Sequence, residues 1–140
     1  MSEHAQLFPA RFEVLSDALA FAAKSGADAG CSPDTCKRIE LVIEELFTNT
    51  VDYGYANTPL PESSRTVRLS ASTVPSGVQI VYEDWAPAFD PTDLAGLNLE
   101  QRLEDRQIGG LGRVLVTSLP NAATYERIDD RNRIILRFNR

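Results

Sequence analysis

Two stretches in the first third of the chain place apolar residues at helical spacing. In residues 13–25 the apolar positions recur every three or four residues, and Gly26 follows as a natural stop. Ahead of the second stretch, Ser32 is a favourable N-cap and Pro33 a favourable first helical residue. Its inward side carries Ile39, Val42, Ile43, Leu46, Phe47 and Thr50. We therefore predict one helix over residues 13–25 and a second that ends near Tyr53-Gly54.

Later segments alternate apolar and polar residues, which is typical of half-buried strands. The predicted strands are residues 66–73, 77–84, 122–128 and 133–138, with a short edge strand at 6–10. Turns are predicted at 75–77 and at 129–132, so the four later strands form two hairpins. Between the hairpins lies a long connection, followed by an apolar helix that opens with glycines and stops before Pro120.

The order of these elements determines the fold class. Two helices, a hairpin, a third helix and a second hairpin do not alternate in the way that a parallel βαβ sheet requires. We predict an α+β fold, a two-layer sandwich with a mixed, mostly antiparallel sheet and helices on one face. At 140 residues the chain fits a single domain, residues 1–140.

Composition and charge narrow the function classes. The net charge is -6 and the pI is about 4.8, which argues against nonspecific binding to nucleic acid or to an anionic membrane. Cys31 and Cys36 have only His4 as a further soft ligand, too few for a zinc site. No apolar run has the length of a membrane span, and the first residues do not resemble a signal peptide. We expect a cytoplasmic protein.

A first candidate site lies on the second predicted helix, where Glu45 and Asn49 are four residues apart and share one face. An Asn side-chain oxygen suits Mg²⁺, and a carboxylate one turn away can accept a proton from an attacking hydroxyl or water. The simpler interpretation is a solvated helix face.

Two further sites follow along the chain. Asp84 ends a predicted strand before a proline-containing loop, where its carboxylate can meet a ligand amino group; the simpler interpretation is a capped turn. Gly109, Gly110 and Gly112 open the third helix, where backbone N–H groups can approach an anion; the simpler interpretation is a flexible loop. In this order, a metal ligand, a base-reading carboxylate and a phosphate cradle indicate an ATP–Mg²⁺ site.

These three motifs resemble those of the Bergerat-fold (GHKL) ATPase family, and within it the small anti-sigma-factor serine kinases. ELVIEELFTNTVDYGY is similar to the family's N box, EDWAPAFDP to its first glycine box and IGGLGRVLVTSL to its second. The closing YERIDDRNRIILRF is similar to the last hairpin of the family. The likeness covers about residues 8–138.

The resemblance implies a role for each motif residue. Asn49 holds Mg²⁺, and Glu45 is the general base for a serine hydroxyl. Asp84 binds the adenine amino group. The remaining nucleotide-binding positions are Ala86, Gly110, Leu111 and Gly112. Ala86 departs from the family, because relatives usually have glycine there, and its methyl group either crowds the nucleotide or is absorbed by the loop.

The resemblance also implies a function. A kinase of this type phosphorylates a serine on an antagonist (anti-anti-sigma-like) protein, also binds a sigma factor, and regulates by switching between the two; a homodimer is plausible. Ala86 motivates the alternative, a nucleotide-responsive adaptor without catalysis, or an interaction domain whose ATP site has decayed. The connection over residues 92–107 is expected to order when nucleotide binds.

Overall fold

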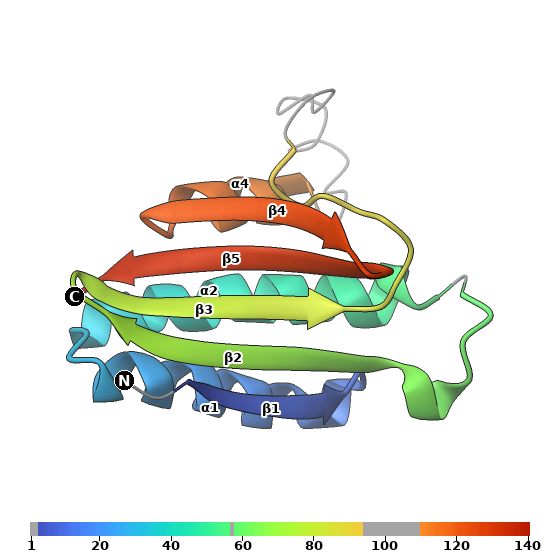
Figure 1. Cartoon of the computed structure of the whole chain (residues 1–140), viewed down its shortest axis with the longest axis horizontal. Coiled ribbons are helices and arrows are strands. Elements are labelled where there is room, and N and C mark those ends of the chain that lie inside the picture. Colours follow the sequence, from blue (N-terminus) through green and yellow to red (C-terminus); the bar gives the residue numbers. More distant parts are fainter. Residues whose placement is uncertain (1–2, 57, 94–109) are drawn as a thin grey trace.

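The fold is a five-stranded antiparallel sheet with its helices packed on one side, seen in a computed structural model that describes residues 3–56, 58–93 and 110–140 (Figure 1). The strands are β1 (His4–Pro9), β2 (Thr66–Val74), β3 (Gly77–Asp84), β4 (Ala122–Ile128) and β5 (Arg131–Asn139). The helices are α1 (Leu15–Asp28), α2 (Pro33–Asn49) and α4 (Gly110–Ser118). The predicted α+β sandwich is confirmed, and every strand pairing is antiparallel, where a partly mixed sheet was allowed for.

The strand order β1-β2-β3-β5-β4 puts β3 and β5 at the centre of the sheet. Asp84 pairs with Asn132 at one end of β3, and Glu83 pairs with Arg133 one residue earlier. Because successive residues of a strand point to opposite faces, Asp84 and Asn132 face the helices whereas Glu83 and Arg133 face away. The core lies between the sheet and the helices, with Phe8, Ile39, Phe47, Leu69, Ile80, Val116, Leu136 and Phe138 among its buried members.

The helix α1 runs two residues beyond its predicted stop at Gly26. Gly26 lies inside the helix, and its lack of a side chain serves packing: a Cβ atom there would be 2.7 Å from Ile39 Cδ1 on α2. The left-handed residue that ends the helix is Gly30, with φ of 86°. The prediction for α2 is confirmed, since the Ser32 hydroxyl accepts a hydrogen bond from the Thr35 N–H and Pro33 is the first helical residue.

The end of α2 has an unusual geometry. After Asn49 the chain continues as a π-helical turn over Thr50–Gly54, so the helical path ends at the predicted position but in a wider form. Such turns are rare and are frequent at functional sites. Residues 85–93 of the long connection form no helix. The predicted ordering on nucleotide binding concerns residues 92–107, of which residues 94–107 lie outside the described part.

Candidate functional site

Asp84 is the buried carboxylate at the centre of the candidate site. Its Oδ2 accepts a hydrogen bond from the Thr50 hydroxyl at 2.7 Å, and its Oδ1 accepts from Asn132 Nδ2 at 2.8 Å and from the Ala86 N–H at 3.2 Å. Burial raises the pKa of Asp84, and the hydrogen bonds from Asn132 and Thr50 act against this rise. The carboxylate is therefore held in one orientation by three donors from three segments.

The π-helical turn ties the end of α2 to β3 through hydroxyl groups. The Thr50 and Tyr82 hydroxyl oxygens are 2.6 Å apart, and each lies 3.0 Å from the carbonyl oxygen of Leu46. Burial raises the pKa of Tyr82 well above its usual value, so the phenol stays protonated and available as a donor. Because Thr50 also bonds Asp84, this network fixes Asn49, the preceding residue, relative to the strand end.

Tyr55 anchors the loop that follows Asp84. Its hydroxyl donates to the Thr66 carbonyl at 2.7 Å and accepts from the Trp85 N–H at 2.8 Å. Burial raises the pKa of Tyr55 to about 12. The two tyrosines of the Tyr53-Gly54-Tyr55 motif thus differ: Tyr55 is buried and hydrogen-bonded, whereas Tyr53 is exposed.

Asn132 is a site residue on β5, so the predicted turn over residues 129–132 is wrong at this position. Only Asp129 and Asp130 form that turn, with φ of 51° and 61°, so β5 begins at Arg131 and buries the Asn132 side chain. Its Nδ2 donates to Asp84 Oδ1 and lies within 3.2 Å of the carbonyls of Ala86 and Pro87. Its Oδ1 accepts from the Tyr125 hydroxyl and from the Phe89 N–H. The amide therefore shapes the whole first glycine-box loop.

Ala86 has its methyl group packed against the π-helical turn. Ala86 is buried, and a Cβ atom placed on Gly54 would lie 3.2 Å from Ala86 Cβ. The Ala86 carbonyl also accepts a hydrogen bond from Arg127 at 2.7 Å. Of the two outcomes allowed for this departure from the family pattern, the contact with Gly54 favours absorption of the methyl group by the loop.

Glu45 and Asn49 lie one turn apart on α2 and hold unsatisfied polar atoms. Asn49 is 8% exposed, and neither its Oδ1 nor its Nδ2 has a hydrogen-bond partner among the described residues; the same is true of the buried Glu45 Oε2. Burial raises the pKa of Glu45, and the nearby charge of Glu44 adds to the rise; the Asn49 amide one turn away acts against it, although its geometry does not meet that of a hydrogen bond to Glu45. Buried polar atoms of this kind normally have partners, so these atoms point to an absent ligand.

The start of α4 lies directly over Glu45. A Cβ atom on Gly112 would overlap Glu45 Cδ and Oε2, so any larger residue there would displace the Glu45 side chain. Gly110 and Leu111 complete the first turn of this nine-residue helix, and the first N–H groups of a helix have no partners within it. The predicted helix does begin with these glycines, at Gly110, and its first turn contacts Glu45.

Arg113 connects α4 to the loop after Asp84. Its guanidinium lies 4.7 Å from the centre of the Phe89 ring, and its Nη1 donates to the Asp93 carbonyl at 3.3 Å. Arg113 directly follows the Gly110–Gly112 motif, but nothing in the sequence marks it as a site residue. Arg113 therefore joins the start of α4 to the loop after Asp84, and Gly112 joins it to α2.

The residues present fit a nucleotide with Mg²⁺. No group of three His, Cys, Asp or Glu side chains that could hold a metal occurs among residues 3–56, 58–93 and 110–140. Mg²⁺ needs no such group, because it is commonly held by one or two protein oxygens together with phosphates and water. The orphaned Asn49 amide supplies such an oxygen, and the first turn of α4 offers N–H groups to phosphates.

Comparison with known proteins agrees with this geometry. Residues 8–138 match the family model of the histidine kinase-like ATPase domain, whose members bind ATP. No curated protein matches the chain significantly. Within the described residues, no helix is both long and apolar enough to span a membrane. Because the family model covers nearly all of the chain and the sheet, helices and motifs occur in the matching order, the chain belongs to the histidine kinase-like ATPase domain family.

Proposed function

We propose that the chain is a protein serine kinase of the anti-sigma-factor type, which binds ATP with Mg²⁺ and phosphorylates a serine of an antagonist protein. The observation that carries the proposal is the pairing of Glu45 with Asn49. Both have buried polar atoms without partners among the described residues, they lie one turn apart on α2, and Glu45 lies beneath the glycine start of α4. A domain that only bound nucleotide would need the metal ligand, whereas transfer to a hydroxyl also needs a base.

Asp84 is the residue that recognises the adenine base of the nucleotide. Three hydrogen bonds already occupy much of the acceptor capacity of its two oxygens, which leaves room for about one more donor. An ionised carboxylate accepts hydrogen bonds and does not donate them, so it favours the exocyclic amino group of adenine over the carbonyl oxygen of guanine.

Glu45 and Asn49 on α2, together with the start of α4, are the residues for phosphoryl transfer. The Asn49 oxygen is the protein ligand of Mg²⁺, which when bound neutralises charge on the phosphates. The N–H groups of Gly110, Leu111 and Gly112 hold the phosphate oxygens. Glu45 takes the proton of the serine hydroxyl, and its raised pKa makes it a stronger base than an ordinary glutamate.

The partners belong to the same proposal. The resemblance of the motifs to anti-sigma-factor kinases supports an antagonist protein as substrate and a sigma factor as the alternative partner, with a cytoplasmic homodimer as the working form. Neither nucleic acid nor membrane is a proposed partner, in keeping with the net charge of -6.

A second candidate is an adaptor that responds to nucleotide without catalysis. The observation that favours it is the environment of Asp84, where Thr50, Ala86 and Asn132 already supply three donors. If these bonds leave no capacity for adenine, the site binds nucleotide weakly and the chain acts through its surface alone.

Transfer of ³²P from ATP to a candidate antagonist protein distinguishes the two. The kinase proposal predicts phosphoserine on the antagonist with the wild type and none with Glu45→Ala. The matched control is Glu44→Ala, because Glu44 is the adjacent carboxylate and is exposed. Transfer that persists in Glu45→Ala contradicts the assignment of the base, and ATP binding without any phosphoserine favours the adaptor.

A further inference from the structure

Arg127 lies on the same face of the sheet as Asp84, two strands away. It is opposite Asn132 in the pairing of β4 with β5, and Asn132 is opposite Asp84 in the pairing of β5 with β3. Side chains that lie opposite each other in neighbouring strands share a face of the sheet. These three residues therefore form a row beside the candidate site, with a guanidinium at one end and a carboxylate at the other.

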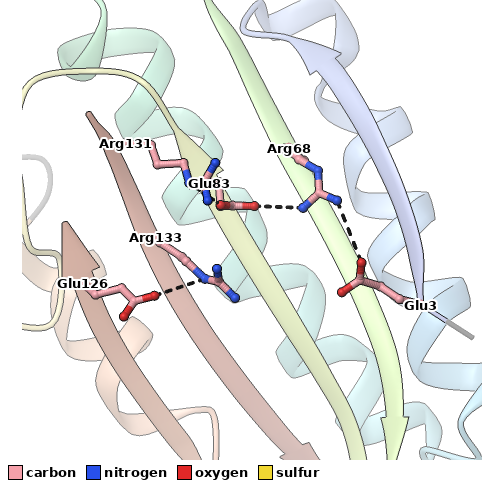
Figure 2. A network of polar contacts seen from close by, with 6 residues as sticks. All are labelled: Glu3, Arg68, Glu83, Glu126, Arg131 and Arg133. Atoms are coloured by element: carbon pink, nitrogen blue, oxygen red, sulfur yellow. Dashed lines mark hydrogen bonds and ion pairs between the residues drawn. The ribbon is translucent and has the colours of Figure 1, made fainter. Parts of the chain in front are cut away.

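The arginines on the opposite face of the sheet are paired with carboxylates. Arg68 on β2 and Arg131 on β5 lie 2.9 Å and 2.8 Å from the two carboxylate oxygens of the buried Glu83 (Figure 2). Arg133 lies 3.3 Å from a carboxylate oxygen of Glu126 on β4 (Figure 2). The charges of this network are balanced within the chain, so the network gives no indication of a ligand.

Arg127 has no such carboxylate partner. It forms no ion pair with residues 3–56, 58–93 or 110–140. Its Nη1 donates to the carbonyl oxygen of Ala86 at 2.7 Å, which uses one of the five N–H donors of a guanidinium. The residue is exposed on the edge strand, so its remaining donors are open to a ligand.

The Ala86 peptide groups lie between this guanidinium and the Asp84 carboxylate. The Ala86 N–H donates to Asp84 Oδ1 at 3.2 Å, while the Ala86 carbonyl oxygen accepts from Arg127. Asn132 bridges the same groups, since its Nδ2 is 2.8 Å from Asp84 Oδ1 and 3.2 Å from the Ala86 carbonyl oxygen. Burial raises the pKa of Asp84, and the positive charge of Arg127 acts against that rise, so the two charges are close without direct contact.

From this arrangement we infer that Arg127 is a second base-reading residue, which donates a hydrogen bond to a ring nitrogen of adenine while Asp84 accepts one from the adjacent amino group. The amino group of adenine lies between two ring nitrogens, N1 and N7, and both are hydrogen-bond acceptors. An acceptor held beside a donor is the complement of either edge of the base. The inference rests on the proposed binding of adenine by Asp84 and does not depend on catalysis by Glu45.

The same pair of residues selects against guanine at the N1 edge. Guanine has a carbonyl oxygen in place of the amino group, and its N1 carries a hydrogen. The carboxylate of Asp84 would then face an oxygen, and the guanidinium of Arg127 would face an N–H group. Polar groups left without partners in a closed site cost more than a lost hydrogen bond, so Arg127 adds to the discrimination that Asp84 supplies.

The test measures the affinity of the full chain for ATP, 1-deaza-ATP and 7-deaza-ATP, each with Mg²⁺, by calorimetric titration. Each analogue replaces one ring nitrogen by C–H and keeps the amino group and the triphosphate. The test variant is Arg127→Met. The control is Arg137→Met, an equal loss of charge on the opposite face of the sheet, where Arg137 donates to Gln79.

The inference predicts a preference that depends on Arg127. The wild type should bind one of the two analogues about tenfold more weakly than ATP, because a hydrogen bond to a charged donor is lost. Arg127→Met should bind ATP about tenfold more weakly and should bind ATP and that analogue within about twofold of each other. Arg137→Met should keep the preference of the wild type. The analogue that binds weakly identifies the ring nitrogen as N1 or N7.

A second variant separates the charge of Arg127 from its geometry. Arg127→Lys keeps the positive charge but lacks the planar fork that can donate to Ala86 and to the base together, so its preference should fall to about threefold or less. An unchanged preference in this variant overturns the inference. So does an equal loss for ATP and both analogues in Arg127→Met, which a general charge effect on the phosphates or a disturbed loop would give.

The wild type alone distinguishes a failure of the inference from a failure of the proposed function. If it binds none of the three nucleotides, the proposed ATP site fails and the inference fails with it. If it binds ATP and both analogues equally well, the ATP site stands and only the role of Arg127 is overturned.

Discussion

Replacing Gly112 by alanine tests how closely the start of α4 is fitted to Glu45. The methyl group would overlap Cδ and Oε2 of Glu45, so the Glu45 side chain must move. The backbone at Gly112 is not left-handed, and alanine can adopt it. The whole effect of the substitution should therefore depend on which residue stands at position 45.

Two opposing terms set the magnitude. Alanine in place of glycine within a helix stabilises by up to about 1 kcal/mol. Displacing a half-buried carboxylate from a packed contact costs about 1–3 kcal/mol, in the range found for overpacked sites. With Glu45 present, Gly112→Ala should then destabilise by about 1 kcal/mol; with Glu45→Ala, the space is free and the same change should stabilise. The coupling between the two positions is about 2 kcal/mol.

Urea unfolding of the wild type, both single variants and the double variant measures this coupling. Glu44→Ala replaces Glu45→Ala in the control cycle and should give a coupling near zero, because Glu44 is exposed. A coupling below about 0.5 kcal/mol in the Glu45 cycle is within ordinary additivity. It would mean that α4 does not rest on Glu45, and the geometry of the phosphate site would be refuted with it.

Three further predictions concern the same site. Glu45→Gln should be more stable than the wild type at neutral pH, because a carboxyl whose pKa is raised by folding destabilises the fold once it is ionised. The gain in stability should be absent below about pH 4, grow as the pH rises to the raised pKa and stay constant above it. Thermal unfolding at a series of pH values measures this gain. Asn132→Ala should cost about 3 kcal/mol in urea unfolding because Asp84 and several loop groups lose a buried partner; a loss under about 1 kcal/mol contradicts this role. Ala86→Gly should leave ATP affinity within about twofold while lowering stability by about 1 kcal/mol, since the methyl group contacts Gly54; a large gain in affinity would show that the methyl group crowds the nucleotide.

Much of the fold follows from local patterns in the sequence. Apolar spacing and alternation place the helices and strands within a few residues, and Ser32 and Pro33 mark the start of α2 by their own chemistry. The two glycine boxes and the Glu45–Asn49 stripe were also visible, because helical spacing alone puts the latter on one face. These signals are short-range, which is why a single sequence reveals them.

The failures have a common cause in long-range contacts. The sequence alone predicts a helix end at Gly26, because the close approach of this residue to Ile39 on another helix leaves no local signal. The predicted turn at residues 129–132 hides the role of Asn132, because that role comes from the pairing of β5 with β3, which brings Asn132 beside Asp84. The Asp129-Asp130 pair could have indicated a two-residue turn, and with it a strand that starts at Arg131. The cover of Glu83 by Arg68 and Arg131 depends on the same register.

Calorimetric titration of ATP with Mg²⁺ into the wild type and Asn49→Ala tests the central claim most directly. Neither polar atom of the Asn49 side chain has a partner among the described residues, so the variant should fold normally and report on the ligand alone. We predict binding of about -8 kcal/mol, a micromolar dissociation constant, for the wild type and at least a tenfold loss in Asn49→Ala. No heat up to about millimolar ATP, or equal affinity in the two proteins, would contradict the assignment of this site.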